Sequence, residues 1–475
     1  MERLIYDGKL DLLNSKDVAS SRIGIGFEKL DRAVFDPEKA YDKVAALGVK
    51  KVRIQSGWMR TEKEKGKYDF EWLDSIVDNL LSRGLEPWMC LCYGNPLYTK
   101  KAEGTLGAVG YAPIETEEEM QAWLAYVAAT VCHFEGRVQL YEIWNEPDCP
   151  YAWGHVTWKE FDKIKGAYDY GEFALRTAKI VKESSENAKT IGFALGHLEN
   201  FTYVNNAMST GLYKYLDYVS FHVYSSHDEK REERTKRFRT FLDTYDKRIG
   251  IIQGESGAQT RSDGNGAMRG FSWTQEKQMK YLLRTLVCDL YCGVEFTSYF
   301  SAMDMIEAHR GIIGNRASYQ DFGYFGVIKA DFDEEGFATG NYTEKPSYYA
   351  LGALCSLLKG NARACDIPFA VESLPSLRVN GRDYDGDELK IYPFELDDGR
   401  RAMIYWNCTD ILTTTYEGTA SFCVYRQDNS KIRLVDLRDG SIYKLPETMI
   451  RDMGHGAVRL ENIPLTDCPM AIVFG

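Results

Sequence analysis

Between residues 21 and 360 the sequence alternates short apolar runs with amphipathic stretches, and no other feature constrains the fold as strongly. The apolar runs have the length of buried strands, and the stretches between them have the apolar spacing of helices. Eight strands, each followed by a helical segment, predict an α/β protein built on a (β/α)8 TIM barrel. The predicted strands are residues 23–27, 51–55, 87–92, 138–144, 190–195, 218–224, 249–253 and 294–299.

Helix signals fall between these strands. Asp36-Pro37 offers a capping residue and a first-turn proline, and Gly48 ends the predicted helix. Thr116 and Glu119 form a capping box for a helix that runs to about residue 132, and residues 346–358 form the closing helix. A doubly wound open sheet is the alternative fold, but it usually carries a glycine-rich phosphate loop after its first strand, which this sequence lacks.

The pattern changes after residue 361, where short alternating runs and Asp-Gly pairs at 398–399 and 439–440 are typical of strands and hairpin turns. We therefore expect a β-sandwich over residues 361–475, a catalytic barrel over 21–360, and N-terminal strands within 1–20 that join the sandwich.

Composition limits the partners and the compartment. The 475-residue chain has a formal net charge of -12, which disfavours binding to nucleic acid. Its 11 cysteines are odd in number, several sit in apolar runs, and their spacing fits neither a zinc site nor a disulfide framework. No apolar signal core or membrane-length run is present, so we expect a cytoplasmic protein away from membranes. The seven histidines form no metal-ligand cluster, and we expect no metal or organic cofactor. The sequence does not decide whether the protein forms a homo-oligomer.

Two glutamates stand where a barrel carries its chemistry, at the C-terminal ends of strands. Glu146 ends the fourth predicted strand, and Glu255 ends the seventh. A pair of carboxyl groups facing each other across the barrel mouth is what glycoside hydrolysis requires, one as an acid and the other as nucleophile or base. Glu142 and Glu295 are weaker alternatives because they lie inside or early in their strands.

Further candidates surround this pair. Arg53, at the end of the second strand, could keep the nucleophile ionised, and Tyr224, at the end of the sixth, could donate a hydrogen bond to it. Other candidates for the wall of the site follow the first three strands: Glu28, Trp58, Tyr93 and Asn95.

Several segments resemble clan A glycoside hydrolases. Trp144-Asn145-Glu146-Pro147 and Gly254-Glu255-Ser256-Gly257 are similar to the two catalytic segments of that clan. The segment from Trp58 to Asp74 is similar to one found in its families 39, 5 and 42. The sandwich tail and the Lys345-Pro346-Ser347-Tyr348 segment are most similar to family 39, the β-xylosidase type.

The resemblance implies a role for each matching residue. Glu146 would be the acid/base, Glu255 the nucleophile, and Asn145 a ligand of the sugar 2-hydroxyl. His222 and Tyr224 match the His-x-Tyr pattern of the clan's sixth strand, point inward on the same face, and are candidates for contact with the sugar.

The end of the eighth strand departs from the pattern, because Tyr299 and Phe300 stand where many members carry a tryptophan that floors the sugar subsite. Tyr299 and Phe300 are therefore the candidates for this part of the wall. The long loop that follows, Ser301 to Asp321, carries Asp304, His309 and Arg310. Because of these departures, the resemblance does not identify the sugar that the protein binds.

The leading hypothesis is a retaining glycoside hydrolase, exo-acting and β-xylosidase-like, whose partner is a short oligosaccharide or glycoside. An endo-glycanase and a glycosidase for another sugar remain alternatives on the same barrel. An inactive carbohydrate-binding protein is an alternative of another class, and it would be expected to lack one of the two carboxylates.

Overall fold

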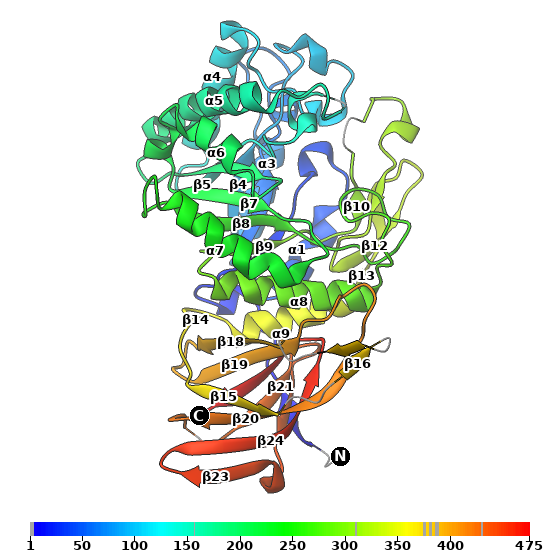
Figure 1. The fold of residues 1–475 in the computed structure, drawn as a ribbon. Coiled ribbons are helices and arrows are strands. Elements are labelled where there is room, and N and C mark those ends of the chain that lie inside the picture. The colour runs from blue at the N-terminus through cyan, green and yellow to red at the C-terminus, as the bar shows by residue number, and fades with distance from the viewer. Residues whose placement is uncertain are drawn as a thin grey trace.

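The computed structural model describes residues 4–155, 157–308, 311–373, 377–379, 382–384, 389–428 and 431–475. Eight parallel strands close into a barrel, with helices around it (Figure 1). The strands are β2 (Ile23–Gly26), β3 (Lys51–Gln55), β4 (Glu86–Leu91), β5 (Leu140–Ile143), β6 (Lys189–Leu195), β7 (Tyr218–His222), β8 (Gly250–Ser256) and β9 (Thr297–Tyr299). The predicted TIM barrel is confirmed, and each predicted strand overlaps one of these eight.

The helices of the barrel lie between these strands. They are α1 (Tyr41–Ala45), α2 (Trp58–Thr61), α3 (Glu71–Ser82), α4 (Glu117–His133), α5 (Lys163–Ser184), α6 (Phe201–Met208), α7 (Arg231–Leu242), α8 (Gln275–Tyr291) and α9 (Pro346–Leu357). The Thr116 hydroxyl accepts the amide of Glu119 at 3.2 Å, so this predicted cap is present. The first predicted helix is split into a 3-10 turn, Pro37–Lys39, and α1.

The segment between β9 and α9 contains strands that the sequence analysis did not predict. β10 (Met305–Ile306) pairs with β11 (Phe322–Gly323), and β12 (Ile328–Phe332) pairs with β13 (Ala338–Glu344). The pairing of β10 with β11 folds the long loop after β9 back on itself. Phe300 and Glu307, at the start of this segment, line the pocket described below.

Two antiparallel sheets follow the barrel and pack face to face. The first contains β1 (Ile5–Lys9), β14 (Arg363–Ala364), β18 (Leu389–Glu395), β19 (Arg401–Asn407), β21 (Arg433–Asp436), β22 (Ser441–Lys444) and β25 (Met470–Phe474). The second contains β15 (Phe369–Ser373), β20 (Glu417–Tyr425), β23 (Ile450–Gly454) and β24 (Ala457–Thr466). Alternate side chains of both sheets, such as Tyr405, Phe422 and Ile472, share one apolar core. This arrangement is a β-sandwich, as predicted for the C-terminal part of the chain.

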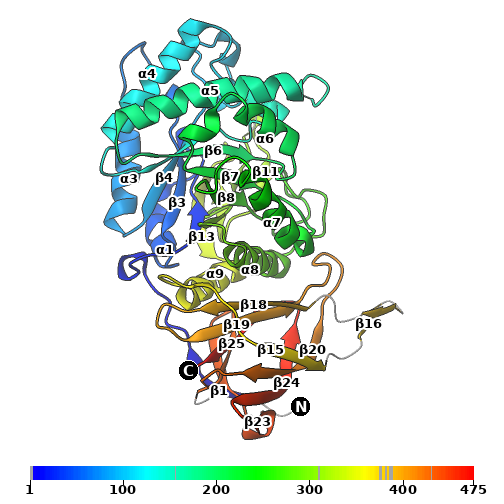
Figure 2. The same cartoon turned by 60° about the vertical axis from the view of Figure 1, so that its left-hand side comes forward.

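The helices α8 and α9 lie between the barrel and the sandwich in both views (Figures 1 and 2). Arg284 of α8 is fully buried there, and its guanidinium donates to the carbonyl oxygens of Asp467 and Thr409. Lys280, one turn earlier on the same helix, pairs with the Asp467 carboxylate at 2.9 Å. A short antiparallel strand near the N-terminus also reaches the sandwich, because β1 pairs with β22.

Across the described ranges of the chain, no helix is both long and apolar enough to cross a lipid bilayer. All 11 cysteines belong to those ranges, and each is a free thiol.

Candidate active site

A pocket of about 510 Å³ opens at the C-terminal ends of the barrel strands. This volume lies within the range of about 300–1,000 Å³ typical of small-ligand sites. Seven residues predicted from the sequence line it: Glu28, Tyr93, Asn145, Glu146, Tyr224, Glu255 and Phe300. Arg53 and His222 lie below its surface and bind the two central glutamates.

Glu146 is carried by a tight turn directly after β5. Trp144 and Glu146 both have left-handed backbone angles, with φ of 67° and 46°. Such angles are sparsely populated by residues other than glycine, and surrounding contacts must hold them. One such contact is the Trp144 indole, which is fully buried and donates to the Ala152 carbonyl oxygen at 3.0 Å. The turn directs the Glu146 carboxylate out of the strand and into the pocket.

Two donors bind the Glu146 carboxylate. The Tyr151 hydroxyl donates to Oε2, and the Nδ1 atom of His222 lies 3.0 Å from Oε1. Burial lowers the pKa of His222, but the neighbouring Glu255 and Glu146 carboxylates outweigh it, so the pKa lies above its usual value. The His222 ring is therefore easier to protonate than a free imidazole.

Glu255, near the end of β8, is bound on both of its oxygens. Arg53 Nη1 lies 2.7 Å from Oε2, and the Tyr224 hydroxyl donates to Oε1 at 2.6 Å. Hydrogen bonds from a cation and a hydroxyl favour the ionised form of a carboxylate. Its side chain is 14% exposed at the floor of the pocket, so the carboxyl group faces the ligand space.

Arg53 joins the two strands that carry the glutamates. It is fully buried and also binds Glu142 through Nε at 2.9 Å and Asn145 Oδ1 through Nη2 at 2.9 Å. Burial lowers the pKa of Arg53, yet Glu142 and the other carboxylates nearby raise it well above its usual value. Glu142 is therefore the internal counter-ion of Arg53, and its burial inside the barrel fits the structural role expected of it.

The Asn145 side chain is fixed between two neighbours. Its Oδ1 atom accepts from Arg53, and its Nδ2 atom lies 3.4 Å from the Tyr151 hydroxyl. The amide is thus held at the edge of the pocket, next to Glu146, in one orientation.

Glu146 and Glu255 face each other across His222. The nearest donor atoms of the three side chains all lie within 4.8 Å of one another. Both carboxylates therefore reach one small volume in which a single bond can be attacked from one side and protonated from the other.

A third carboxyl group, Glu28, lies next to this pair. Burial raises its pKa to about 7, although Arg53 lowers it, and Glu255 raises it further. Its Oε1 atom is 3.4 Å from Arg53 Nη1, whereas its buried Oε2 atom has no hydrogen-bond partner in the structure. Near neutral pH this group can therefore carry a proton and donate to a ligand.

Three residues predicted to form the wall lie elsewhere. Trp58 is fully buried in an aromatic cluster, stacked on Tyr98 and Tyr126, because its strand-end loop folds back as α2 against α4. Asn95 donates to the Glu62 carbonyl oxygen and shapes the loop after β4. Tyr299 is fully buried beneath the pocket, beside Ala258. Thus Phe300 is the aromatic residue at this strand end that reaches the ligand space.

Of the charged residues in the loop after β9, Glu307 lines the pocket and Asp304 does not. Asp304 is buried and pairs with Lys345 at 2.7 Å, away from the pocket. His309 and Arg310 lie outside the described residues. Glu307 instead lines the pocket and pairs with Lys29 at 3.3 Å.

Several pocket residues carry no local signal in the sequence. Tyr151 reaches the pocket because the chain after Glu146 forms a 3-10 turn, Pro150–Trp153. This turn places the Tyr151 hydroxyl against the Glu146 carboxylate. His197 arrives because the buried Asp148 accepts the backbone amides of Gly196 and His197 and ties the loop after β6 to the loop after β5. The other unpredicted residues of the pocket include Lys29, Arg32, Gln55, Arg269, Glu307 and Phe325.

Among the residues that the structure describes, two sets of side chains have donor atoms close enough to hold a cation. One is Glu146, His222 and Glu255, and the other is Asp148, Cys149 and His197. In the first set Arg53 supplies the positive charge, and in the second the Asp148 oxygens already accept two backbone amides. Contacts within the protein therefore account for both sets.

The sequence matches the model of glycosyl hydrolases family 39 over residues 36–237, which include Glu146 and the strands β3 to β7. A family 39 glycoside hydrolase from Bacteroides cellulosilyticus WH2 is 18% identical with a TM-score of 0.64, over 96% of this chain and 81% of that chain. A family 39 β-xylosidase from Caulobacter crescentus is 17% identical with a TM-score of 0.57, over 100% of both chains. A family 30 endoxylanase from Clostridium papyrosolvens C71 is 10% identical with a TM-score of 0.55, over 99% of both chains.

At these identities the likeness to solved structures shows a shared fold, and the family match over residues 36–237 indicates the class of reaction. The resemblance predicted from the sequence is thereby confirmed: the chain is a glycoside hydrolase similar to family 39 of clan A, with the family match over residues 36–237.

Proposed function

We propose that this glycoside hydrolase retains anomeric configuration, with Glu255 as the nucleophile and Glu146 as the general acid/base. The observation that carries the proposal is the approach of the two carboxylates, whose nearest oxygens lie within 4.8 Å. Retaining enzymes hold their two carboxyl groups about 5–5.5 Å apart, and inverting enzymes need about 6.5–9.5 Å for an intervening water.

In the first step a Glu255 oxygen attacks the anomeric carbon, and the bond to the leaving oxygen breaks. Glu146 donates its proton to that oxygen, so a neutral alcohol departs and a covalent glycosyl ester with Glu255 remains. In the second step Glu146 removes a proton from water, whose oxygen attacks the same carbon and releases Glu255 as a carboxylate. The contacts fit this division of roles, because Arg53 and Tyr224 favour an ionised Glu255.

Proton transfer at Glu146 involves its two donors. Tyr151 and His222 bind separate oxygens of the carboxylate and fix its plane. His222 Nδ1 also lies 3.6 Å from Glu255 Oε2, so one imidazole ring contacts both carboxyl groups. Held in this way, Glu146 can accept and return a proton without moving, which is the requirement for general acid/base catalysis.

We propose that the sugar ring binds above Glu255, with Asn145 hydrogen-bonded to its 2-hydroxyl. Glu28, Tyr93, Tyr224 and Phe300 are the predicted residues that line this space. Exo action is consistent with a wall that takes Tyr93, Tyr151 and Glu307 from the loops after β4, β5 and β9. A β-xyloside is the first substrate to test, since family 39 β-xylosidases share the whole fold.

A panel of aryl β-glycosides on wild type and two variants tests the roles. Glu255→Ala should lose at least about 10⁴-fold in kcat on every substrate, because no covalent ester can form. Glu146→Ala should lose about 10²–10⁴-fold on substrates with poor leaving groups and far less on activated ones, because only the former need a proton. Normal turnover by Glu255→Ala would exclude the proposed nucleophile.

Proton NMR of the first-formed anomer tests retention directly. A β-product from a β-glycoside supports double displacement, and an α-product contradicts it. Product analysis on an oligosaccharide separates exo action, which releases one terminal sugar at a time, from an endo-glycanase, which releases mixed lengths.

A further inference from the structure

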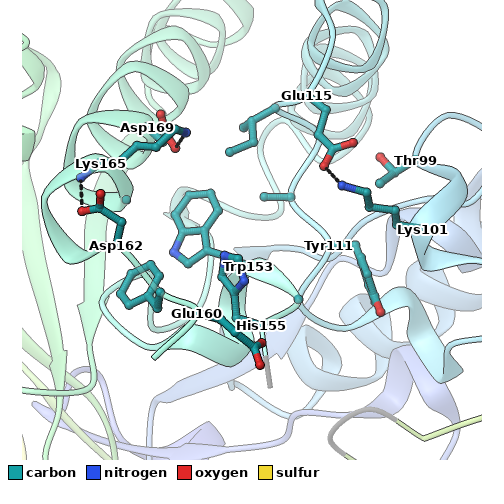
Figure 3. Close-up of a pocket in the computed structure, with 15 residues that line it drawn as sticks. Thr99, Lys101, Tyr111, Glu115, Trp153, His155, Glu160, Asp162, Lys165 and Asp169 are labelled. Carbon is teal, nitrogen blue, oxygen red and sulfur yellow. Dashed lines mark hydrogen bonds and ion pairs between the residues drawn. The ribbon is translucent and has the colours of Figure 1, made fainter. Parts of the chain in front are cut away.

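A second cavity, of about 630 Å³, is lined in part by Trp153 and Gly154 of the loop after β5, which also carries Glu146. Figure 3 shows its lining residues. The cavity is formed by the loops after β4 and β5 and by the first turns of α5. Its lining residues include Thr99, Lys101, Tyr111, Glu115, Trp153, His155, Glu160, Phe161, Asp162, Lys165 and Asp169. None of these residues lines the pocket around Glu146 and Glu255.

The two cavities share a thin wall. Tyr151, whose hydroxyl binds Glu146, and Trp153, which lines the second cavity, belong to the same 3-10 turn. The chain before Tyr111 packs directly on this turn, because a Cβ atom at Gly110 would lie 2.0 Å from the Tyr151 carbonyl oxygen. One turn of backbone therefore separates the acid/base residue from the second cavity.

Aromatic rings form two sides of the second cavity. The Trp153 indole is held by a 2.6 Å hydrogen bond from Nε1 to the Pro147 carbonyl oxygen. Tyr111 stands on the opposite side of the cavity in Figure 3, and Phe161 also lines it. Fixed aromatic rings offer apolar faces of the kind on which the C–H face of a pyranose packs.

The charged residues of the cavity are mostly paired with one another. Lys101 binds Glu115, and Lys165 binds Asp169 at 2.5 Å. Asp162 accepts the amides at the start of α5. The lining thus holds two lysines and four carboxyl groups, so its net charge disfavours an anion and suits a neutral ligand.

The position of the second cavity near Glu146 indicates which part of a substrate it could bind. A general acid protonates the leaving oxygen, so the leaving group must lie on the Glu146 side of the scissile bond. We propose that the second cavity binds the sugar residues of the leaving group, as a distal subsite for an oligosaccharide substrate. This inference rests on the assignment of Glu146 as the acid/base.

The test compares substrates with and without a leaving-group saccharide. Values of kcat/KM are measured for an aryl β-xyloside and for β-1,4-xylo-oligosaccharides of two to six residues, with the matching glucose and galactose series in parallel. The variants are Tyr111→Ala and Trp153→Phe, which keep Glu146 and its two donors. The control is Tyr168→Ala, which removes an exposed tyrosine of α5 that does not line either cavity.

For wild type we expect kcat/KM to rise with chain length beyond the disaccharide on the series that it cleaves. Tyr111→Ala should lose roughly tenfold more on the longest oligosaccharide than on the aryl glycoside, the size expected for one lost stacking contact. Tyr168→Ala should follow wild type at every length. Thermal unfolding of each variant shows whether it is folded.

A wild-type kcat/KM that does not change with length, or a Tyr111→Ala loss that is equal on all substrates, overturns the distal subsite while leaving the proposed mechanism intact. Absence of hydrolysis of every aryl glycoside and oligosaccharide by wild type instead overturns the proposed function itself. In Trp153→Phe we expect kcat/KM to rise with oligosaccharide length as in wild type, because the phenyl ring keeps an apolar face in the cavity.

Discussion

Arg53 Nη1 lies 2.7 Å from Glu255 Oε2, at the bottom of the barrel mouth. The guanidinium is fully buried, and its other nitrogens bind Glu142 and Asn145. A planar fork with five donors can serve all of these acceptors at once, which an ammonium group cannot do. The charge of the proposed nucleophile and the orientation of Asn145 therefore depend on one side chain.

Arg53→Lys should lower kcat/KM for an aryl glycoside by about 100-fold or more, because one ammonium cannot bind both Glu142 and Glu255. It should also lower the free energy of unfolding by about 3 kcal/mol, the scale for breaking a buried ion pair. The measurements are steady-state kinetics and urea unfolding. Arg284→Lys, a buried arginine that binds the sandwich, serves as control and should lose stability with little change in kcat/KM. Equal kinetic losses in both variants would show that Arg53 acts only through stability.

Tyr151→Phe removes the hydroxyl that binds Glu146 Oε2. The effect should depend on the leaving group: about tenfold lower kcat/KM for a poor leaving group and a much smaller change for an activated one. The physical reason is that proton donation by Glu146 limits only the first class. A dependence of rate on leaving-group pKa, measured over a series of aryl glycosides, should therefore be steeper than in wild type. An unchanged slope would remove Tyr151 from proton transfer.

Glu28→Gln tests the raised pKa of the third carboxyl. Burial raises the pKa of Glu28 from 4.5 to about 7 in the folded protein. Folding thus favours the protonated group: this contribution to stability is complete below about pH 4.5 and is lost as the pH rises through about 7. Glutamine stays neutral, so the variant should gain stability relative to wild type between these limits.

The measurement is the free energy of unfolding of both proteins in urea at several pH values from 4 to 8.5. The difference between Glu28→Gln and wild type should shift in favour of the variant as the pH increases. Parallel pH profiles would contradict the raised pKa.

Trp58→Phe separates structure from substrate contact. The indole Nε1 atom donates to Glu62 Oε2 at 2.6 Å within the buried aromatic cluster. Phenylalanine leaves that acceptor without this donor, so the free energy of unfolding should fall by about 1–3 kcal/mol. KM should stay as in wild type, because the ring does not line the pocket. Trp158→Phe, on an exposed ring, should change stability by less than about 0.5 kcal/mol. A raised KM in Trp58→Phe would restore the wall role first expected of it.

The barrel was predictable because its strands are local signals. Each buried strand of a parallel sheet is a nearly continuous apolar run, and the longest helices, α4, α5 and α8, each begin at a capping side chain. The short strands β10 to β13 were missed for the converse reason. They are two to seven residues long and are stabilised by pairing with each other, which a local pattern does not display.

The wall of the pocket was only partly predictable. Position after a strand end selected Tyr93 and Glu28, which line the pocket, and also Trp58 and Asn95, whose side chains turn into the protein. A strand end fixes where a loop starts, but not which way its side chains point. That direction follows from packing against neighbouring helices and loops.

The sequence by itself determined the barrel, the sandwich and the positions of two glutamates at the ends of β5 and β8. It could do so because strands and their ends are recognised from the pattern of neighbouring residues. Only the tertiary structure decided how those glutamates are held. The contacts of Arg53 with Glu255 and of Tyr151 with Glu146 join loops from different strands, and the raised pKa of Glu28 arises from burial among them. Such contacts depend on distance and dielectric environment in the folded chain, which no local pattern specifies.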